Sequence, residues 1–92
     1  MSIFLEIILK SEDFKFDGRD AVEDPLDDAL ANLGIGEVTG GGAGMGFSNI
    51  DVEVTDLDIG LQVIRETLSS LGVAESTVIK QYKPVIKEYS VY

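Results

Sequence analysis

Residues 49–72, NIDVEVTDLDIGLQVIRETLSSLG, change their hydrophobic period from two to 3.6 at Asp56. Before this point apolar and polar residues alternate over 50–55, as in a strand with one buried face. After it, leucine and isoleucine recur at spacings of four and three as far as Gly72, as on one side of a helix. Aspartate is a favoured helix N-cap and glycine a favoured stop. The segment therefore predicts a strand over 50–55 followed directly by an amphipathic helix over 57–71.

The same two periods take turns along the rest of the chain. Residues 3–10, IFLEIILK, alternate as a strand does, and residues 23–34, EDPLDDALANLG, predict a helix. For that helix we expect Asp24 as the N-cap, Pro25 at the first helical position and Gly34 as the stop. Three shorter segments predict further strands, namely GEVTG (36–40), STVIKQY (76–82) and, after Pro84, VIKEYSVY (85–92).

The resulting order is strand, helix, strand, strand, helix, strand, which predicts an α+β fold of the ferredoxin-like βαββαβ type. Its antiparallel sheet would carry both helices on one face, and residues 85–92 would extend the last strand or add an edge strand. At 92 residues the chain fits a single domain, residues 1–92, with one core. The first and third strands would be central neighbours, so the core would receive Ile3, Leu5, Ile7, Ile50, Val52 and Val54.

The second face of this sheet would carry two large apolar groups, Phe4 and Ile8, beside Asp51 and Glu53. Large apolar side chains on a central strand are unfavourable in contact with water, so this face needs a cover. We expect a homodimer, with the C-terminal segment 85–92 folding back and a foreign partner as the alternatives. All four residues are therefore candidates for partner binding.

Composition excludes several chemistries. The chain has no cysteine and no histidine, which removes disulfides, thiol catalysis and the commonest general base and metal ligand. No apolar run approaches the ~20 residues of a membrane helix, and the N-terminal segment lacks the basic start of a signal peptide, so we expect a cytoplasmic protein. Seventeen acidic residues against seven basic ones give a net charge of −10, which disfavours nucleic acid and anionic membranes and favours a basic partner.

Residues 40–46 hold five glycines, Gly40, Gly41, Gly42, Gly44 and Gly46. Nucleotide-binding motifs place such glycines ahead of a helix, with GxGxxG spacing or with a lysine at the end of the loop. Here a strand follows, the third-glycine positions hold Met45 or Phe47, and no lysine is near. We expect no ATP, NAD or other cofactor, and interpret the run as a flexible, wide or bulged connection between strands. A loop that reshapes around a partner is the alternative.

Acidic residues gather in two places. Residues 12–28 contain eight acids and two bases around two phenylalanines, a pattern typical of a solvated surface and also of an interface that binds a basic protein. The partner-binding candidates there are Phe14, Phe16, Asp24, Asp27 and Asp28. In DVEVTDLD, residues 51–58, four acids offer a hard cation or an acid–base pair as weaker alternatives. The spacing of a calcium loop is absent and no nucleophile accompanies them, so we assign no catalytic or metal-binding residue.

The C-terminal segment KQYKPVIKEYSVY, residues 80–92, interleaves three lysines with three tyrosines. Such a pattern can stack nucleic-acid bases. Because the net charge opposes nucleic acid, we interpret the segment as an edge strand that lysines protect from pairing with other chains.

The run GEVTGGGAGMG followed by NIDVEVTDLDIGLQVIRETLSSLG resembles small, uncharacterised bacterial proteins of ferredoxin-like build, over about residues 26–79. Acidic proteins of this size are also similar to immunity proteins that neutralise toxins. The resemblance implies a non-enzymatic protein-interaction module, and it transfers no functional residue. The rival function is a small-molecule-sensing regulatory dimer in which residues 40–46 close over a ligand. An enzyme that uses Asp51 and Glu53 is the weakest alternative.

Overall fold

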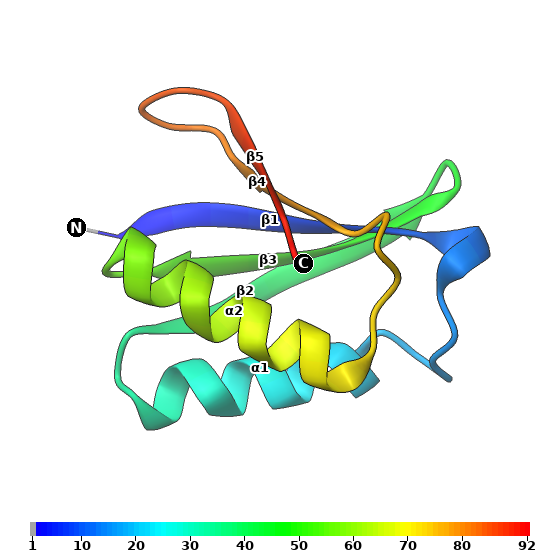
Figure 1. Cartoon of the computed structure of the whole chain (residues 1–92), viewed down its shortest axis with the longest axis horizontal. Coiled ribbons are helices and arrows are strands. Elements are labelled where there is room, and N and C mark those ends of the chain that lie inside the picture. The colour runs from blue at the N-terminus through cyan, green and yellow to red at the C-terminus, as the bar shows by residue number, and fades with distance from the viewer. Residues whose placement is uncertain (1) are drawn as a thin grey trace.

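The computed structural model describes residues 2–92, which form one five-stranded antiparallel sheet with both helices on one face (Figure 1). The strands follow the order β2-β3-β1-β4-β5 across the sheet. The elements are β1 (Ile3–Lys10), the 3-10 turn η1 (Ser11–Asp13), α1 (Asp20–Asn32), β2 (Gly36–Gly44), β3 (Phe47–Val54), α2 (Leu57–Leu71), β4 (Val78–Gln81) and β5 (Lys87–Ser90). The α+β class, the element order and the extra C-terminal edge strand agree with the sequence prediction.

β1 and β3 are neighbours near the centre of the sheet, as predicted, and their register sets the core. Leu5 lies opposite Val52 and Ile7 opposite Ile50, and all four side chains are fully buried. Val54 is buried as well, whereas Ile3 at the start of β1 is half-buried. The helices supply the other wall of the core with Val22, Leu26, Leu30, Leu61, Ile64 and Leu68. Burying each large apolar side chain contributes about 1.5–3 kcal/mol, so the alternation along β1 and β3 decides which face receives the helices.

The ends of the helices follow the local sequence. Asp56 Oδ1 accepts a hydrogen bond from the backbone N–H three residues on, at 2.9 Å, and so caps α2 as predicted. Gly34 and Gly72 follow α1 and α2 with φ of 65° and 78°, a conformation that favours glycine. Gly60 allows α2 to approach β3 closely, because a Cβ there would lie 2.8 Å from Val54 Cγ2.

α1 begins one turn earlier than predicted. It starts at Asp20, so Asp24 is not its N-cap and Pro25 is an internal residue. Backbone N–H groups of the first turn donate to the carbonyl of Arg19, which takes the place of a side-chain cap. The earlier start buries Val22 completely, and this burial offsets the one backbone hydrogen bond that Pro25 cannot donate.

The glycine run is a strand, which corrects the loop prediction for Gly40, Gly41, Gly42 and Gly44. These residues belong to β2 and pair with β3, and the turn consists of Met45 and Gly46. The register shifts between Val38 and Gly40, so a β-bulge lies at Thr39. Glycine has both the backbone N–H and the carbonyl that strand pairing requires, and β3 is a long strand available for pairing. Pairing therefore overrides the low strand propensity of glycine.

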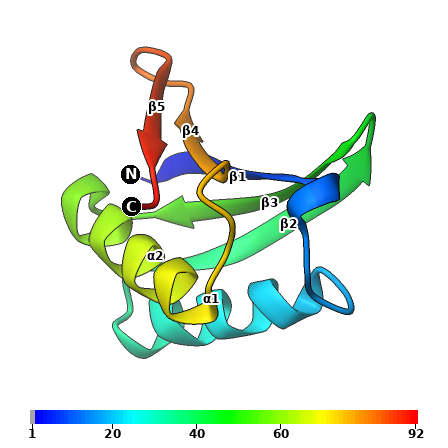
Figure 2. The same cartoon turned by 45° about the vertical axis from the view of Figure 1, so that its right-hand side comes forward.

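The last two strands form a hairpin that rises from the sheet on the side opposite the helices (Figures 1 and 2). Val85 and Ile86 in its connection are exposed, whereas Val91 after β5 is buried in the core. Residues 85–92 therefore extend the sheet edge and return to the helix side. They do not cover the second face of the sheet, which was one of the predicted alternatives.

A helix side chain forms a hydrogen bond with a backbone group of each edge strand. Asp27 Oδ1 of α1 accepts a hydrogen bond from the Val38 N–H of β2 at 2.9 Å. Arg65 Nε of α2 donates to the Ser90 carbonyl of β5 at 2.7 Å. Edge groups that are already bound pair less readily with another chain. One backbone group of each edge strand is therefore already bound within the chain.

Candidate interaction surface

The face of the sheet that points away from both helices is the candidate surface, and we call it the open face (Figure 2). Period two places alternate residues of each strand on it. The register assigns to it Phe4, Glu6 and Ile8 of β1, Asn49, Asp51 and Glu53 of β3, Glu37, Gly40 and Gly42 of β2, and Lys80 of β4. The sequence prediction that Phe4, Ile8, Asp51 and Glu53 share one face is consistent with this register.

Two pairs of like charges lie directly across neighbouring strands of the open face. Glu6 of β1 is opposite Asp51 of β3, and Glu37 of β2 is opposite Glu53 of β3. Side chains in such positions have Cβ atoms about 5 Å apart, and like charges there destabilise the sheet. Among residues 2–92 the one ion pair lies elsewhere, at the start of α1, between Arg19 just before the helix and Glu23 in its first turn, at 3.0 Å. Lys80 of β4, opposite Glu6, offsets only part of the charge of these four acids, so the open face carries a net negative charge.

Neutral groups provide the hydrogen bonds that these carboxylates accept. Ser2 Oγ donates to Glu53 Oε1 at 2.9 Å, Asn49 Nδ2 donates to Asp51 Oδ1 at 2.9 Å, and the Tyr82 hydroxyl donates to Glu6. These bonds orient the acids without neutralising them. Lys80 of β4 lies opposite Glu6 in the register but forms no ion pair with it, so a cation brought by another molecule would be the first to pair with these acids.

The pKa of the hydroxyl of Tyr82, directly after β4, is affected by the acids of the open face. Its hydrogen bond to the Glu6 carboxylate, its partial burial and the charges of Glu6, Asp51 and Glu88 raise the pKa of the Tyr82 hydroxyl to about 12. The ammonium of Lys80 lies 5.1 Å from the centre of the Tyr82 ring and would act in the opposite direction. The charges of Glu6, Asp51 and Glu88 all act in the direction that disfavours the phenolate.

An aromatic pair lies at one end of the open face. The rings of Phe4 and Tyr82 have centroids 6.0 Å apart, and the two residues are 40% and 37% exposed. With Ser2, Ile3, Lys83 and Pro84 they line a hollow of about 680 Å³, which we call the aromatic hollow. The β4–β5 connection forms one wall of it. Exposed aromatic rings beside a concavity are typical of binding surfaces.

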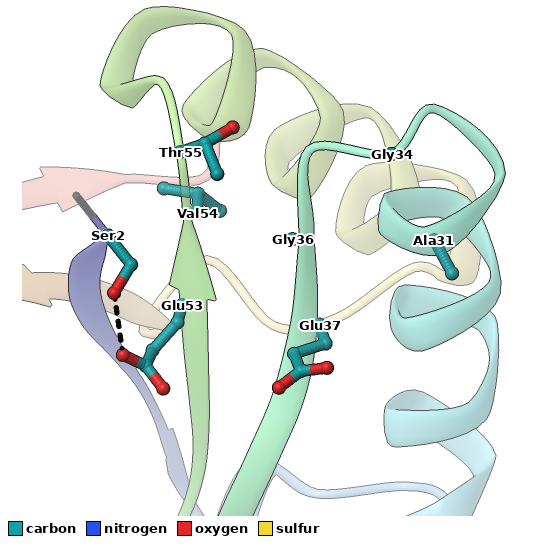
Figure 3. Close-up of a pocket in the computed structure, with 8 residues that line it drawn as sticks. All are labelled: Ser2, Ala31, Gly34, Gly36, Glu37, Glu53, Val54 and Thr55. Atoms are coloured by element: carbon teal, nitrogen blue, oxygen red, sulfur yellow. Dashed lines mark hydrogen bonds between the residues drawn. The ribbon is translucent and has the colours of Figure 1, made fainter.

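A second hollow of about 420 Å³ adjoins the first, and Ser2 lines both (Figure 3). We call it the acidic hollow, because Glu37 and Glu53 are its charged lining residues. Figure 3 shows their side chains extending from neighbouring strands, with Ser2 bound to Glu53. Its other lining residues are small or apolar: Ala31, Gly34, Gly36, Val54 and Thr55. An aromatic surface and a pair of carboxylates thus lie side by side.

Glycines keep part of the open face flat. A Cβ at Gly40 or Gly42 would make ordinary contacts with Asp51 Oδ2 at 3.6 Å and Asn49 Oδ1 at 3.4 Å. Gly41 points to the helix side, where a Cβ would lie 2.6 Å from the backbone oxygen of Asn49. Packing within the chain therefore requires glycine at position 41 and leaves room for a side chain at positions 40 and 42.

The candidates in the acidic segment 12–28 lie on the helix side of the molecule. Phe14 and Phe16, both half-buried, form an edge-to-face pair with centroids 5.2 Å apart and pack against the core. Asp27 is half-buried and binds the Val38 N–H, so its carboxylate has a structural role. Asp24 and Asp28 are exposed and remain a second, purely acidic surface.

Sequence reasoning did not select Ser2, Glu6, Glu37 or Tyr82 as site residues. The alternation of β1 already placed Glu6 between Phe4 and Ile8, and this was the one usable signal. The others join the surface through strand pairing, which a single sequence does not specify. Within the described part of the chain, no three acidic side chains gather as a metal site would require, and no helix is long and apolar enough to cross a membrane.

No protein-family model matches the chain, and neither a curated protein nor a solved structure matches it.

Proposed function

We propose that this protein is a non-enzymatic interaction module whose open face binds a basic partner protein. The observation that carries the proposal is the pair of like-charge contacts, Glu6 with Asp51 and Glu37 with Glu53, next to the exposed ring of Phe4. Such pairs lower the stability of the free protein, and a cationic partner would relieve them. Features that cost stability without a local compensation are expected at functional sites.

The strand order β2-β3-β1-β4, with both helices on one face, supports the ferredoxin-like assignment that we include in this proposal. An immunity-type role is a narrower form of the same proposal, in which the basic partner is a toxin. A toxin-like gene immediately upstream would support that form. The ligand-sensing alternative loses its main premise, because Gly40–Gly44 form a strand and not a loop that closes.

A homodimer through the open face is the second candidate. The exposed ring of Phe4 and the half-buried side chain of Ile8 favour it, since a second copy would remove both from water. The acid pairs oppose it, because two negative faces would meet. This balance places the basic partner first.

The proposal is tested by capturing partners from a lysate of the cells that express the protein, with three baits. These are the wild type, the double variant Glu6→Gln/Asp51→Asn, and the control Asp24→Asn/Asp28→Asn, which makes the same change in net charge on α1. We expect a basic protein that the wild type and the control retain and the open-face variant loses. The purified partner should then bind with an affinity that falls as salt rises. Equal retention by both variants, or no retained protein, contradicts the proposal.

A further inference from the structure

We propose that the aromatic and acidic hollows together bind an extended segment of the partner that carries an apolar residue two positions before an arginine or lysine. The inference rests on the proposed function and specifies its recognition chemistry. The apolar side chain would occupy the aromatic hollow, and the cationic side chain would lie between Glu37 and Glu53. Successive residues of an extended chain point to opposite sides, so residues i and i+2 face the same surface, about 7 Å apart.

The aromatic hollow suits an apolar side chain and not a cationic one. Phe4 and Tyr82 present partly exposed rings, and Ile3 and Pro84 add apolar lining. Filling the hollow would remove both rings from water, which is the usual source of binding energy at an interface anchor. Lys83 also lines this hollow, and its ammonium would repel a second cation.

The acidic hollow suits a cationic side chain. Glu37 and Glu53 lie opposite each other, and a guanidinium or ammonium between them would turn a repulsive pair into two attractive contacts. The Ser2 hydroxyl already holds one oxygen of Glu53 in place, so part of the ordering cost is met before binding. Because Ser2 lines both hollows, a short segment can reach from one to the other.

A third hollow in the structure is acidic but lacks the other features of the proposed binding site. It is lined by Glu23, Asp24 and Asp27 of α1 together with Val38, Thr39 and Gly40, and encloses about 320 Å³. Two of its three acids already have partners, since Glu23 pairs with Arg19 and Asp27 with the Val38 N–H. It also has no aromatic lining. The α1 acids therefore serve as the control surface.

Three capped tripeptides test the inference by NMR titration of the ¹⁵N-labelled full chain at 150 mM salt, where non-specific attraction is screened. Acetyl-Leu-Gly-Arg-amide carries both features. Replacing its arginine by citrulline removes the charge at nearly constant shape, and replacing its leucine by alanine removes the apolar anchor. We expect Leu-Gly-Arg to shift the amide resonances of Phe4, Lys83, Glu37 and Glu53. Each of the other two peptides should bind about fivefold more weakly.

Two variants complete the test. Glu53→Gln should remove the preference for arginine over citrulline, and Asp28→Asn should retain it. Equal binding of the arginine and citrulline peptides to the wild type, or equal effects of the two variants, would overturn the inference. Shifts at the centre of the open face, at Ile8 and Asn49, without shifts in the hollows would overturn the inference and leave the proposed function standing. Shifts confined to α1, or none at all, would overturn both.

Discussion

Glu6 of β1 and Asp51 of β3 lie directly opposite each other on the open face, and each carboxylate accepts a hydrogen bond from a neutral side chain. Their hydrogen-bond donors belong to Tyr82 and Asn49 and add no positive charge. A sheet selected for stability alone would place a lysine or threonine in one of these positions. The arrangement predicts several measurable properties.

Removing one of the two charges should stabilise the free protein. In Glu6→Gln the amide still accepts the bond from Tyr82, and the repulsion from Asp51 is lost. Lys80, opposite Glu6 on β4, forms no ion pair with it, so little attraction is lost and we expect the free energy of unfolding to rise by about 0.2–1 kcal/mol. The gain should shrink between 10 mM and 300 mM salt, because exposed charges are screened. Urea unfolding at both salt concentrations measures it. The control Asp28→Asn should show a smaller change, and a loss of stability in Glu6→Gln would contradict the argument.

The Tyr82 hydroxyl should ionise at an unusually high pH. The hydrogen bond to Glu6 raises the pKa of Tyr82 to about 12, from an ordinary value near 10. The folded state thus favours the neutral phenol, so this contribution to stability is complete below pH 10 and is lost as the pH rises through 12. Absorbance near 295 nm follows the ionisation, and Tyr82→Phe identifies the late step. In Glu6→Gln the late step should move toward pH 10; an unchanged titration would show that Glu6 is not its cause.

Neighbouring glycines of β2 should respond in opposite ways to alanine. Gly41→Ala places a Cβ 2.6 Å from the Asn49 backbone oxygen, so we expect it to destabilise the fold. Gly42→Ala meets no atom closer than 3.4 Å and should stabilise it by about 0.5–1 kcal/mol, because glycine is unfavourable inside a strand. Thermal unfolding of the two variants measures the difference. Equal effects would mean that residues 40–44 do not form the strand described above.

The homodimer, as the second candidate for the open face, predicts a distinctive salt dependence. A face-to-face dimer brings Asp51 and Glu53 near their copies, so it should be weak at low salt and tighten as salt screens the repulsion. Sedimentation at tens of micromolar measures the association, and Phe4→Glu should abolish it by placing a charge at its centre. A wild type that stays monomeric at low and high salt would exclude this dimer and leave the basic partner as the occupant of the open face.

The amino-acid sequence determined the elements whose pattern is local. β1 and β3 could be predicted because a strand repeats every two residues, which gives a clear alternation of apolar and polar residues. α2 could be predicted because its leucine stripe, the Asp56 cap and Gly72 all indicate the same boundaries. The same alternation placed Phe4, Ile8, Asp51 and Glu53 away from the core. These features depend on residues within one or two turns of each other, so no knowledge of distant contacts was needed.

Tertiary structure decided the start of α1, the strand character of the glycine run and the composition of the two hollows. α1 begins before Pro25 because the burial of Val22 outweighs the one backbone hydrogen bond that proline cannot donate. Residues Gly40–Gly44 are extended because they pair with β3, although glycine by itself has a low strand propensity. Tyr82 meets Phe4 only because β4 pairs with β1, across 78 residues of sequence. Local helix and strand propensities differ by about 1 kcal/mol or less for most residues, whereas burial of a large apolar side chain contributes more to stability. Where the two conflict, the long-range contacts therefore determine the structure.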